Sequence, residues 1–579
     1  MGLKITKTNL LLLGIFVLAL VLRIIAASHV VMSADELVYA SIPINIISAG
    51  RLSTVYQQQL YFYVADLGYQ LMGGVTPIAT RLPAIIFGSF AVFVIFALAR
   101  DLFSSKVGLI SAFLFAVSGY AVRYNFEADM AAFFFGLSSV LFFLRWLWES
   151  KNKNLYLSSL FLALGVSMKN ILLLFVPAYV IVWLFMRKRA PFSAEKLSMK
   201  NSILPIVLGI LIFLVVLSPI FAYNYILYKE KGITDFYFST ILGVGKNAYQ
   251  GLENRSWSIP IFSAKSAQVF MRLFNYDGPL ILLGFLGMFL SFRKKMLETL
   301  FLFLTMGFLF AYLAGVTGSP SHYLWIPLIL SIFAGHCIVA VHEKITQRWR
   351  LRHFIPLVLT LIFVFNVIFI WDVLSKKDAV LALREYVHNN IPEEAIVILD
   401  PRVYRGIYAW AFNDKHYLEG TAFPQLKELL EKSTTSKVTI PIYYIECGKG
   451  TTCIWSTEDY ERVNDFGKQL TDYFRNNTEQ VAQVTGKAGV RDTFVVYHGA
   501  IAAPVEIYEA IDRTHIFWFY PVGWKYTDDV IDNYEAKGFH KILNSLGFVF
   551  LYIDFFTALL SLPFVLFLLR KQQEVTLYE

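Results

Sequence analysis

The chain has 579 residues, of which 57% are hydrophobic and 16% are charged. Because a soluble globular protein carries about 25% charged residues, this composition excludes a soluble globular fold and indicates a chain that crosses the membrane repeatedly. The net charge is +9, but in a membrane protein the positions of the charges matter more than their sum.

Apolar runs recur along the whole chain, and a run of about 20 apolar residues crosses a bilayer. We predict twelve spans, at 10–27, 82–100, 107–122, 130–148, 155–168, 170–186, 203–222, 278–292, 297–314, 323–341, 355–372 and 546–569. The fifth and sixth are short and meet around Lys169 and Asn170. The predicted fold class is therefore a polytopic α-helical membrane protein.

The polar segment before the last span differs in kind from the rest of the chain. Alternating strand and helix patterns predict a compact α/β domain there. The expected strands are 395–399, 437–445 and 493–497, and the expected helices are 379–387, 424–432 and 458–475. The expected regions are a transmembrane domain at 1–372 with outer loops 28–81 and 223–277, an α/β domain at 373–545, and a last helix with its tail at 546–579.

The Lys and Arg residues between the spans predict the orientation, because cytoplasmic links are enriched in them. Placing Lys4 and Lys7 in the cytoplasm makes every other inner link basic as well. Those links contain Arg100 and Lys106, Lys151 and Lys153, residues 187–189, residues 293–295, Arg348, Arg350 and Arg352, and Arg570 and Lys571. We expect a multi-pass cell-membrane protein with both termini cytoplasmic and the segment 373–545 outside.

Two acidic clusters fall on the predicted outer side. Asp35 and Glu36 follow the first span, and Glu127 and Asp129 open the fourth. Charges at a membrane boundary are costly when dehydrated and are often functional, so the two clusters are candidates to face one another. Each has a structural alternative. The first pair would be a solvated helix end, and the second would favour the helix dipole by about 0.3–1 kcal/mol.

Basic residues also occur on this outer side, where the topology does not require them. Arg81 begins the second span, Arg123 ends the third, Lys169 lies between the fifth and sixth, and His322 and Tyr323 open the tenth. Arg and Lys can pair with phosphate oxygens, which favours an anionic ligand, and His can donate to phosphate. The alternatives are pairing with the acidic clusters or with lipid headgroups, and for His322 a helix cap.

Cys447 and Cys453 lie close together in the polar segment, joined by a short Gly-containing link. A flexible link on the outer side favours a local disulfide. A metal site is disfavoured there because no His partners lie nearby. The third cysteine, Cys337, lies in an apolar run and is expected to be inert.

The order of these motifs resembles the protein O-mannosyltransferases and the lipid A aminoarabinose transferases, which are polytopic glycosyltransferases of the GT-C class. The matching residues are Asp35-Glu36 followed by Tyr39, Arg81-Leu82-Pro83, Glu127-Ala128-Asp129 before a Phe-rich helix, Gly165 to Asn170, His322-Tyr323-Leu324, and Leu383 to Pro392. The resemblance covers most of residues 1–372. A Lys-Pro-Pro motif of the aminoarabinose transferases is missing from the first loop, where this chain has Gln57-Gln58-Gln59. A Trp-Trp-Asp-Tyr-Gly motif is also missing, which argues against an oligosaccharyltransferase.

The resemblance implies sugar transfer from a polyprenyl-phosphate donor to a protein, lipid or glycan acceptor on the extracytoplasmic face, by inverting direct displacement. It implies Asp35 as the catalytic base, with Glu36 or Asp129 holding the acceptor or the base. The residues expected to bind substrate are Tyr39, Arg81, Arg123, Glu127, Lys169, His322 and Tyr323. No metal ligands are assigned, and a divalent metal cofactor stays open. Membrane lipids are expected partners, and nucleic acid is not.

A transporter or flippase of a lipid-linked or anionic substrate is the competing interpretation. Polar residues near the bilayer midplane would favour it, whereas here the ionisable residues gather at the outer rim and a large outer domain follows. A non-catalytic structural or receptor protein would explain neither the paired acids nor the basic residues on the outer side.

Overall fold

The computed structural model of the protein describes residues 6–30, 32, 36, 52, 59–73, 76–189, 199–235, 238–239, 243–247, 259–316, 319–349, 353–402, 412, 414–432, 435–449, 460–486, 493–515 and 537–571. The chain divides into two compact units. The first comprises residues 1–25, 42–370 and 523–579, and the second comprises residues 26–41 and 371–522.

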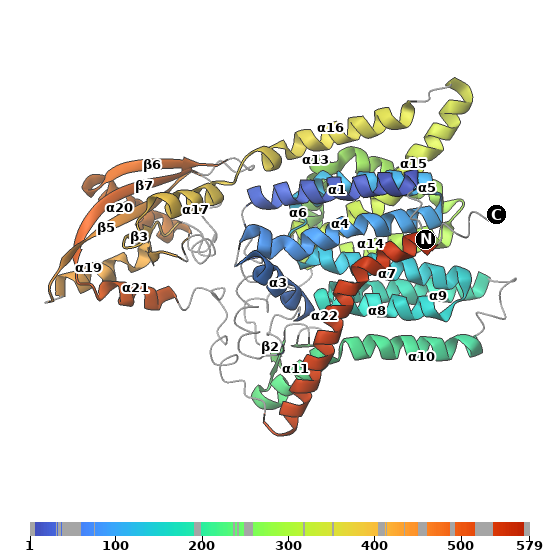
Figure 1. The fold of residues 1–579 in the computed structure, drawn as a ribbon, viewed down its shortest axis with the longest axis horizontal. Helices are drawn as coiled ribbons and strands as arrows, with labels where there is room; N and C mark the ends of the chain where they lie inside the picture. The colour runs from blue at the N-terminus through green and yellow to red at the C-terminus, as the bar shows by residue number, and fades with distance from the viewer. Residues whose placement is uncertain are drawn as a thin grey trace. The chain divides into compact units, whose positions relative to one another are not determined.

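The first unit is helical, and its long helices run side by side, with α22 crossing them obliquely (Figure 1). Its helices are α1 (Lys7–His29, which continues into the second unit), α3 (Gln59–Met72), α4 (Pro77–Leu102), α5 (Ser105–Ala116), α6 (Gly119–Tyr124), α7 (Ala128–Glu149), α8 (Asn152–Met168), the 3-10 helix η1 (Asn170–Phe175), α9 (Val176–Arg189), α10 (Met199–Val216), α11 (Ser218–Lys231), α13 (Ile259–Phe292), α14 (Met296–Val316), the 3-10 helix η3 (Pro320–Tyr323), α15 (Trp325–Trp349), α16 (Phe354–Ser375) and α22 (Phe539–Lys571). Two short strands, β1 (Ile233–Thr234) and β2 (Lys246–Asn247), pair in parallel.

Helix α7 lies at the centre of this unit. Every residue from Ala128 to Leu147 is buried, as expected for a helix that is apolar all round and enclosed by others. It packs against α4 and α8, and the ring of Phe87 on α4 lies 5.3 Å from that of Phe134. A carboxylate in the first turn of α7 is therefore held in a fixed, enclosed place.

Membrane-spanning character is evident in eight helices of the described residues, which are long and apolar enough to cross a bilayer. They are α1, α4, α7, α13, α14, α15, α16 and α22, and the bent pair of α10 and α11 adds a ninth. Large apolar side chains such as Leu211, Leu286 and Leu361 are exposed on them, which suits contact with lipid. The chain is thus a multi-pass α-helical membrane protein. Each of the twelve predicted runs falls on a helix or a helix pair, but the number of spans stays a prediction.

Two of the predicted runs are broken, and each break has a local cause. The run 107–122 divides at Val117 and Ser118, where Ser118 caps α6 by accepting from the backbone N–H of Ala121 at 3.1 Å. The run 203–222 bends by 55° between α10 and α11. Pro219 lies in the first turn of α11, and proline cannot continue the hydrogen-bond ladder of the preceding helix.

Segments expected as outer loops also contain helices. Helix α3 lies within 28–81, and the first half of α13 lies within 223–277. The α3 sequence mixes Gln59, Asp66 and Gln70 with aromatic residues, so it lacks the uninterrupted apolar run that identifies a span. Helix α13 departs from helical geometry at Asp277, where φ is −137° and ψ is 28°.

The second unit contains a five-stranded mixed sheet of order β4-β3-β5-β7-β6. Its elements are α17 (Ala379–Asn390), β3 (Ile396–Leu399), β4 (His416–Glu419), the 3-10 helix η4 (Gly420–Ala422), α19 (Phe423–Lys432), β5 (Val438–Lys449), α20 (Tyr460–Asn477), β6 (Glu479–Thr485), β7 (Thr493–Ala503) and α21 (Ile507–His515). Strand β3 is parallel to β4 and β5, and β7 is antiparallel to β5 and β6. Strands and helices are present at the positions where the sequence predicts them.

The core of this sheet domain explains why these segments fold together. Ile398, Ile442 and Tyr444 are buried against Phe474 of α20, and the Tyr444 and Phe474 rings stack with centroids 4.3 Å apart. Helix α20 is apolar along one side, so its Phe474 and Leu470 cover the sheet.

Candidate functional site

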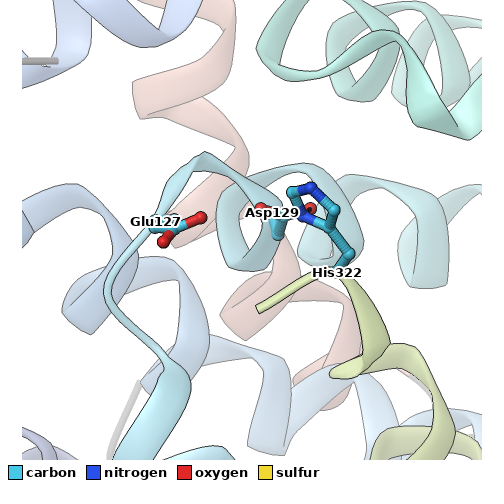
Figure 2. A group of neighbouring side chains, drawn as sticks. All are labelled: Glu127, Asp129 and His322. Carbon is cyan, nitrogen blue, oxygen red and sulfur yellow. Dashed lines mark hydrogen bonds and ion pairs between the residues drawn. The ribbon is translucent and has the colours of Figure 1, made fainter. Parts of the chain in front are cut away.

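Three segments that are far apart in the sequence bring their charged side chains together at the start of α7. The Asp129 carboxylate is fully buried, with 0% of the side chain exposed. The Lys169 ammonium lies 2.5 Å from Oδ2 of Asp129, and Nδ1 of His322 lies 2.9 Å from Oδ1. Figure 2 shows the His322 ring lying against the Asp129 carboxylate. We call these three residues the charge cluster.

The chain turn that places Lys169 lies between α8 and η1. Lys169 ends α8 in extended backbone, and its N–H donates to the carbonyl of Gly165 at 2.8 Å. A Cβ on Gly165 would lie 2.4 Å from Cδ1 of Leu172. Gly165 therefore leaves room for the Leu172 side chain of η1 against α8, next to the turn that presents Lys169 to α7.

His322 is carried by η3, the short turn before α15. Its Nδ1 lies 3.3 Å from Nζ of Lys169 and 2.9 Å from Oδ1 of Asp129. A protonated Nδ1 donates a hydrogen bond to the carboxylate, whereas an unprotonated Nδ1 accepts one from the ammonium. The His322 side chain is 14% exposed, so it is the most accessible member of the charge cluster.

Glu127 precedes α7 as its N-cap residue, but its carboxylate turns to η3 instead of capping the helix. Oε2 accepts a hydrogen bond from Oγ of Ser321 at 2.6 Å. Ser321 is a site residue that the sequence reasoning missed. It stands beside His322 in the stretch before the tenth span, which is the one signal that could have identified it.

The two predicted arginines contact aromatic rings of neighbouring segments. The fully buried Arg81 guanidinium lies 4.2 Å from the centre of the Phe126 ring. The Arg123 guanidinium lies 5.3 Å from the centre of the Tyr276 ring, which suits a cation–π contact. Tyr323 is fully buried, with its ring 6.0 Å from that of Phe310.

The remaining predicted site residues are the first acidic pair, Tyr39 and the cysteines. Asp35, Tyr39 and Cys453 lie outside the described residues. Glu36 is buried, with 2% exposed, and belongs to the second unit. That the two acidic clusters face one another therefore stays a prediction. Cys447 is disulfide-bonded, and its pairing with Cys453 also stays a prediction, while Cys337 is free and buried.

Glu127, Asp129 and His322 also have the composition of a divalent-cation site. One ligand atom from each lies within 4.8 Å of the others. The Lys169 ammonium already contacts Asp129 and approaches His322, so a positive charge is built into the place where a metal ion would bind. Together with Glu127, the charge cluster thus places two carboxylates beside an ammonium and an imidazole.

We predict that the Lys169→Met variant gains affinity for a divalent cation. The substitution keeps the side-chain bulk and leaves two buried carboxylates without the ammonium, which favours metal binding by oxygen and imidazole ligands. In thermal unfolding, Mn²⁺ should raise the midpoint of Lys169→Met more than that of the parent. A stabilisation of about 2.7 kcal/mol is expected at 100 times the dissociation constant. The Lys169→Met/His322→Ala variant lacks one ligand and is the control. Equal Mn²⁺ responses in all three proteins would contradict the prediction.

Residues 59–223 match the family model of the dolichyl-phosphate-mannose-protein mannosyltransferases. This stretch contains Arg81, Arg123, Glu127, Asp129 and Lys169. No curated protein sequence matches the chain.

Solved structures of similar fold include ArnT from Cupriavidus metallidurans. In the apo state it is 13% identical, with a TM-score of 0.52 over 84% of this chain and 97% of that chain. Bound to undecaprenyl phosphate, it is 13% identical, with a TM-score of 0.53 over 85% and 98%. An oligosaccharyltransferase from Archaeoglobus fulgidus is 14% identical, with a TM-score of 0.47 over 86% and 75%. The chain thus has the GT-C fold of ArnT, and it resembles the polyprenyl-phosphate-dependent glycosyltransferases of that class.

Proposed function

We propose that the protein is a membrane glycosyltransferase that moves a sugar from a polyprenyl-phosphate donor to an acceptor hydroxyl on the extracytoplasmic face, with inversion. The observation that carries the proposal is the buried charge cluster, in which Asp129 holds Lys169 and His322 at the start of α7. The ArnT fold and the family match over residues 59–223 support the same class.

The charge cluster suits the departure of a phosphate. When the bond between the anomeric carbon and the phosphate oxygen breaks, negative charge grows on the phosphate, and preorganised positive groups stabilise it. Lys169 supplies a full charge. With Nδ1 of His322 bound to Asp129, Nε2 is the ring nitrogen left to donate to a phosphate oxygen when the imidazole is protonated.

Asp129 is better suited to hold these two groups than to act as the base. Its two oxygens already bind Lys169 and His322, and proton uptake would weaken both contacts. We therefore assign the base to Asp35, with Glu36 beside it. Arg123, which is half-buried, is proposed to contact the donor.

Three further residues are proposed to meet substrate once the site opens. Arg81 and Tyr323 are fully buried and Glu127 is 7% exposed, so their substrate contacts require some movement of the segments that cover them. Tyr39 is proposed to contact substrate beside the acidic pair, and the sequence pattern alone supports this role. The acceptor is proposed to carry a hydroxyl, on a protein, lipid or glycan.

The proposal is tested with purified protein in lipid vesicles containing polyprenyl-phosphate-linked sugars. Consumption of the lipid-linked sugar, release of polyprenyl phosphate and a sugar-sized mass increase on the acceptor would support it. A His322→Ala protein is the matched control and should consume the donor more slowly. Movement of intact lipid-linked sugar across the vesicle membrane, without transfer, would support a flippase and reject the proposal.

We predict that α7 begins outside and ends in the cytoplasm, with both chain termini cytoplasmic. The helix has 22 residues, which span about 33 Å at 1.5 Å per residue, so its ends lie on opposite sides of a bilayer. Lys151, just after α7, has a 58% exposed side chain, and Lys468 in the second unit has a 60% exposed one. An impermeant thiol reagent should label Lys468→Cys on intact cells and Lys151→Cys after permeabilisation. The unsubstituted protein gives the background, and labelling of Lys151→Cys on intact cells would overturn the orientation.

A further inference from the structure

A buried carboxylate outside the charge cluster, Asp277, lies at the break in α13. It is fully buried, it is the residue at which the helix loses its regular geometry, and Gly278 and Pro279 follow it. Oδ2 accepts from Oγ of Ser118 at 2.5 Å and from the N–H of Tyr120 at 3.2 Å. Oδ1 accepts from the N–H of Gly119 at 2.9 Å. A carboxylate in an apolar bundle is costly unless it is hydrogen-bonded, and these donors meet that need.

Three of the donors to Asp277, on Ser118, Gly119 and Tyr120, lie at the start of α6, the short helix before α7. Nδ2 of Asn366 adds a fourth bond at 3.2 Å and also donates to the carbonyl of Val117 at 2.8 Å. A Cβ on Gly119 would lie 2.8 Å from the carbonyl oxygen of Tyr276. The lack of a side chain at Gly119 thus permits the close approach of α6 to the α13 break.

The far end of α6 is held by the residue next to Asp277. The Tyr276 ring lies 5.3 Å from the Arg123 guanidinium and 5.8 Å from the Tyr124 ring, in an edge-on contact. Tyr276 and Asp277 therefore fix both ends of α6. The chain runs from α6 into Glu127 and Asp129, so the break in α13 contacts the segment that leads into α7.

A second connection runs from α6 to the His322 segment. The Tyr120 hydroxyl donates to the carbonyl of Pro320 at 2.7 Å, and Pro320 begins η3. The same turn contacts the start of α7 through Ser321 and His322. Helix α6 is thus attached to both segments that supply the Asp129–His322 contact, one by the chain and one by a hydrogen bond.

We propose that Asp277 is a positioning residue for sugar transfer, which sets the distance between Asp129 and His322 by anchoring α6. This inference rests on the proposed function for its kinetic consequence. Asp277 acts through α6 and Tyr120 and does not touch the reacting atoms. A displacement of about 1 Å at a reacting centre can reduce the rate about 100-fold.

The test compares Asp277→Asn, Tyr120→Phe and their combination. Asp277→Asn keeps the shape but loses the charge and replaces one of the two acceptor oxygens by an NH2 donor, and Tyr120→Phe removes one hydrogen bond without disturbing the packing. Single-turnover transfer per folded molecule should fall about 10- to 100-fold in Asp277→Asn, with a smaller change in donor affinity. The combined variant should fall less than the product of the two effects, because both act through α6.

Asn224→Ala is the matched control. Asn224 is a buried amide that holds α11 by donating to the carbonyl of Ile220 at 3.0 Å and accepting from the N–H of Asp235 at 3.0 Å. This variant should lose stability but keep its transfer rate per folded molecule. If Asp277 were merely structural, Asp277→Asn would behave in the same way.

Hydrogen exchange separates this inference from the proposed function. Amides at 119–130 and 321–324 should exchange faster in Asp277→Asn than in the parent, while those of the sheet domain should not change. If the parent transfers no sugar, the proposed function fails, yet the exchange result still tests the anchoring of α6. Unchanged exchange at 119–130 in Asp277→Asn would overturn the inference. It would also be overturned if Tyr120→Phe transferred sugar at the parent's rate and the effects of the two substitutions on the rate were additive in the combined variant.

Discussion

An Asp129→Asn protein is expected to be less stable than the parent and to transfer sugar at least about 100-fold more slowly. The substitution keeps the shape of the side chain but removes the charge that pairs with Lys169, whose side chain is 6% exposed. Breaking a buried ion pair on one side costs about 3–5 kcal/mol, because the other charge is left buried and unpaired. The rate falls because Lys169 and His322 lose the group that holds them. Thermal unfolding in detergent and transfer per folded molecule measure the two effects.

Two further variants separate the two effects. Asp129→Asn/Lys169→Met removes both charges, so it should recover stability relative to Asp129→Asn but not activity. Asp101→Asn disturbs an ion pair with Arg145, 2.7 Å long, near the other end of α7, and should lower stability while leaving the transfer rate unchanged. A double variant no more stable than Asp129→Asn would show that the unpaired Lys169 is not the cause of the loss.

The apolar helices and the acids at the start of α7 could be predicted from local sequence. The run 130–148 corresponds to α7, because an apolar stretch of that length has few other stable places in a protein. Glu127 and Asp129 stand directly before it, so their position at a helix start needs no tertiary information. The sheet domain was likewise predictable from its alternating pattern of strands and helices.

The contacts between these segments could not be predicted. For Lys169, the sequence left pairing with the acidic clusters and binding of an anionic ligand equally open, and the structure places its ammonium on Asp129. That contact depends on how α8 and η1 pack against α7, and only the Gly165 turn hints at it. Arg81 and Arg123 also contact rings of Phe126 and Tyr276, which a pattern of charges does not predict.

The Asp277 anchor shows a further limit of the sequence pattern. The expected boundary of an outer loop fell at this residue, directly before the apolar run 278–292. An isolated acid beside Gly278 and Pro279 is a signal of a broken helix, but its partners on α6 lie more than 150 residues away. Interpreting such a residue as a loop charge is natural until the fold is known.

An Asp35→Asn protein is expected to bind donor as the parent does but to turn over about 10²–10⁴-fold more slowly. The acceptor hydroxyl must lose a proton as it attacks the anomeric carbon, and the base must have a free oxygen to receive it. Asp129 is a poor candidate, because its oxygens bind Lys169 and His322. Asp35 follows the first span on the predicted outer side, where the charge cluster is also proposed to lie, and asparagine there keeps the shape while removing the basicity.

Donor binding and single-turnover transfer, measured side by side on folded variants, decide this assignment. Lys169→Ala is the opposite case, and it should weaken donor binding as well as rate, since its ammonium is proposed to meet the phosphate. Glu36→Gln is the matched neighbour and should slow transfer less than Asp35→Asn. If Asp35→Asn transfers sugar near the parent rate, Asp35 is not the base. A large loss in Glu36→Gln would then move the role to Glu36, because Asp129 could accept the proton only by weakening its contacts with Lys169 and His322.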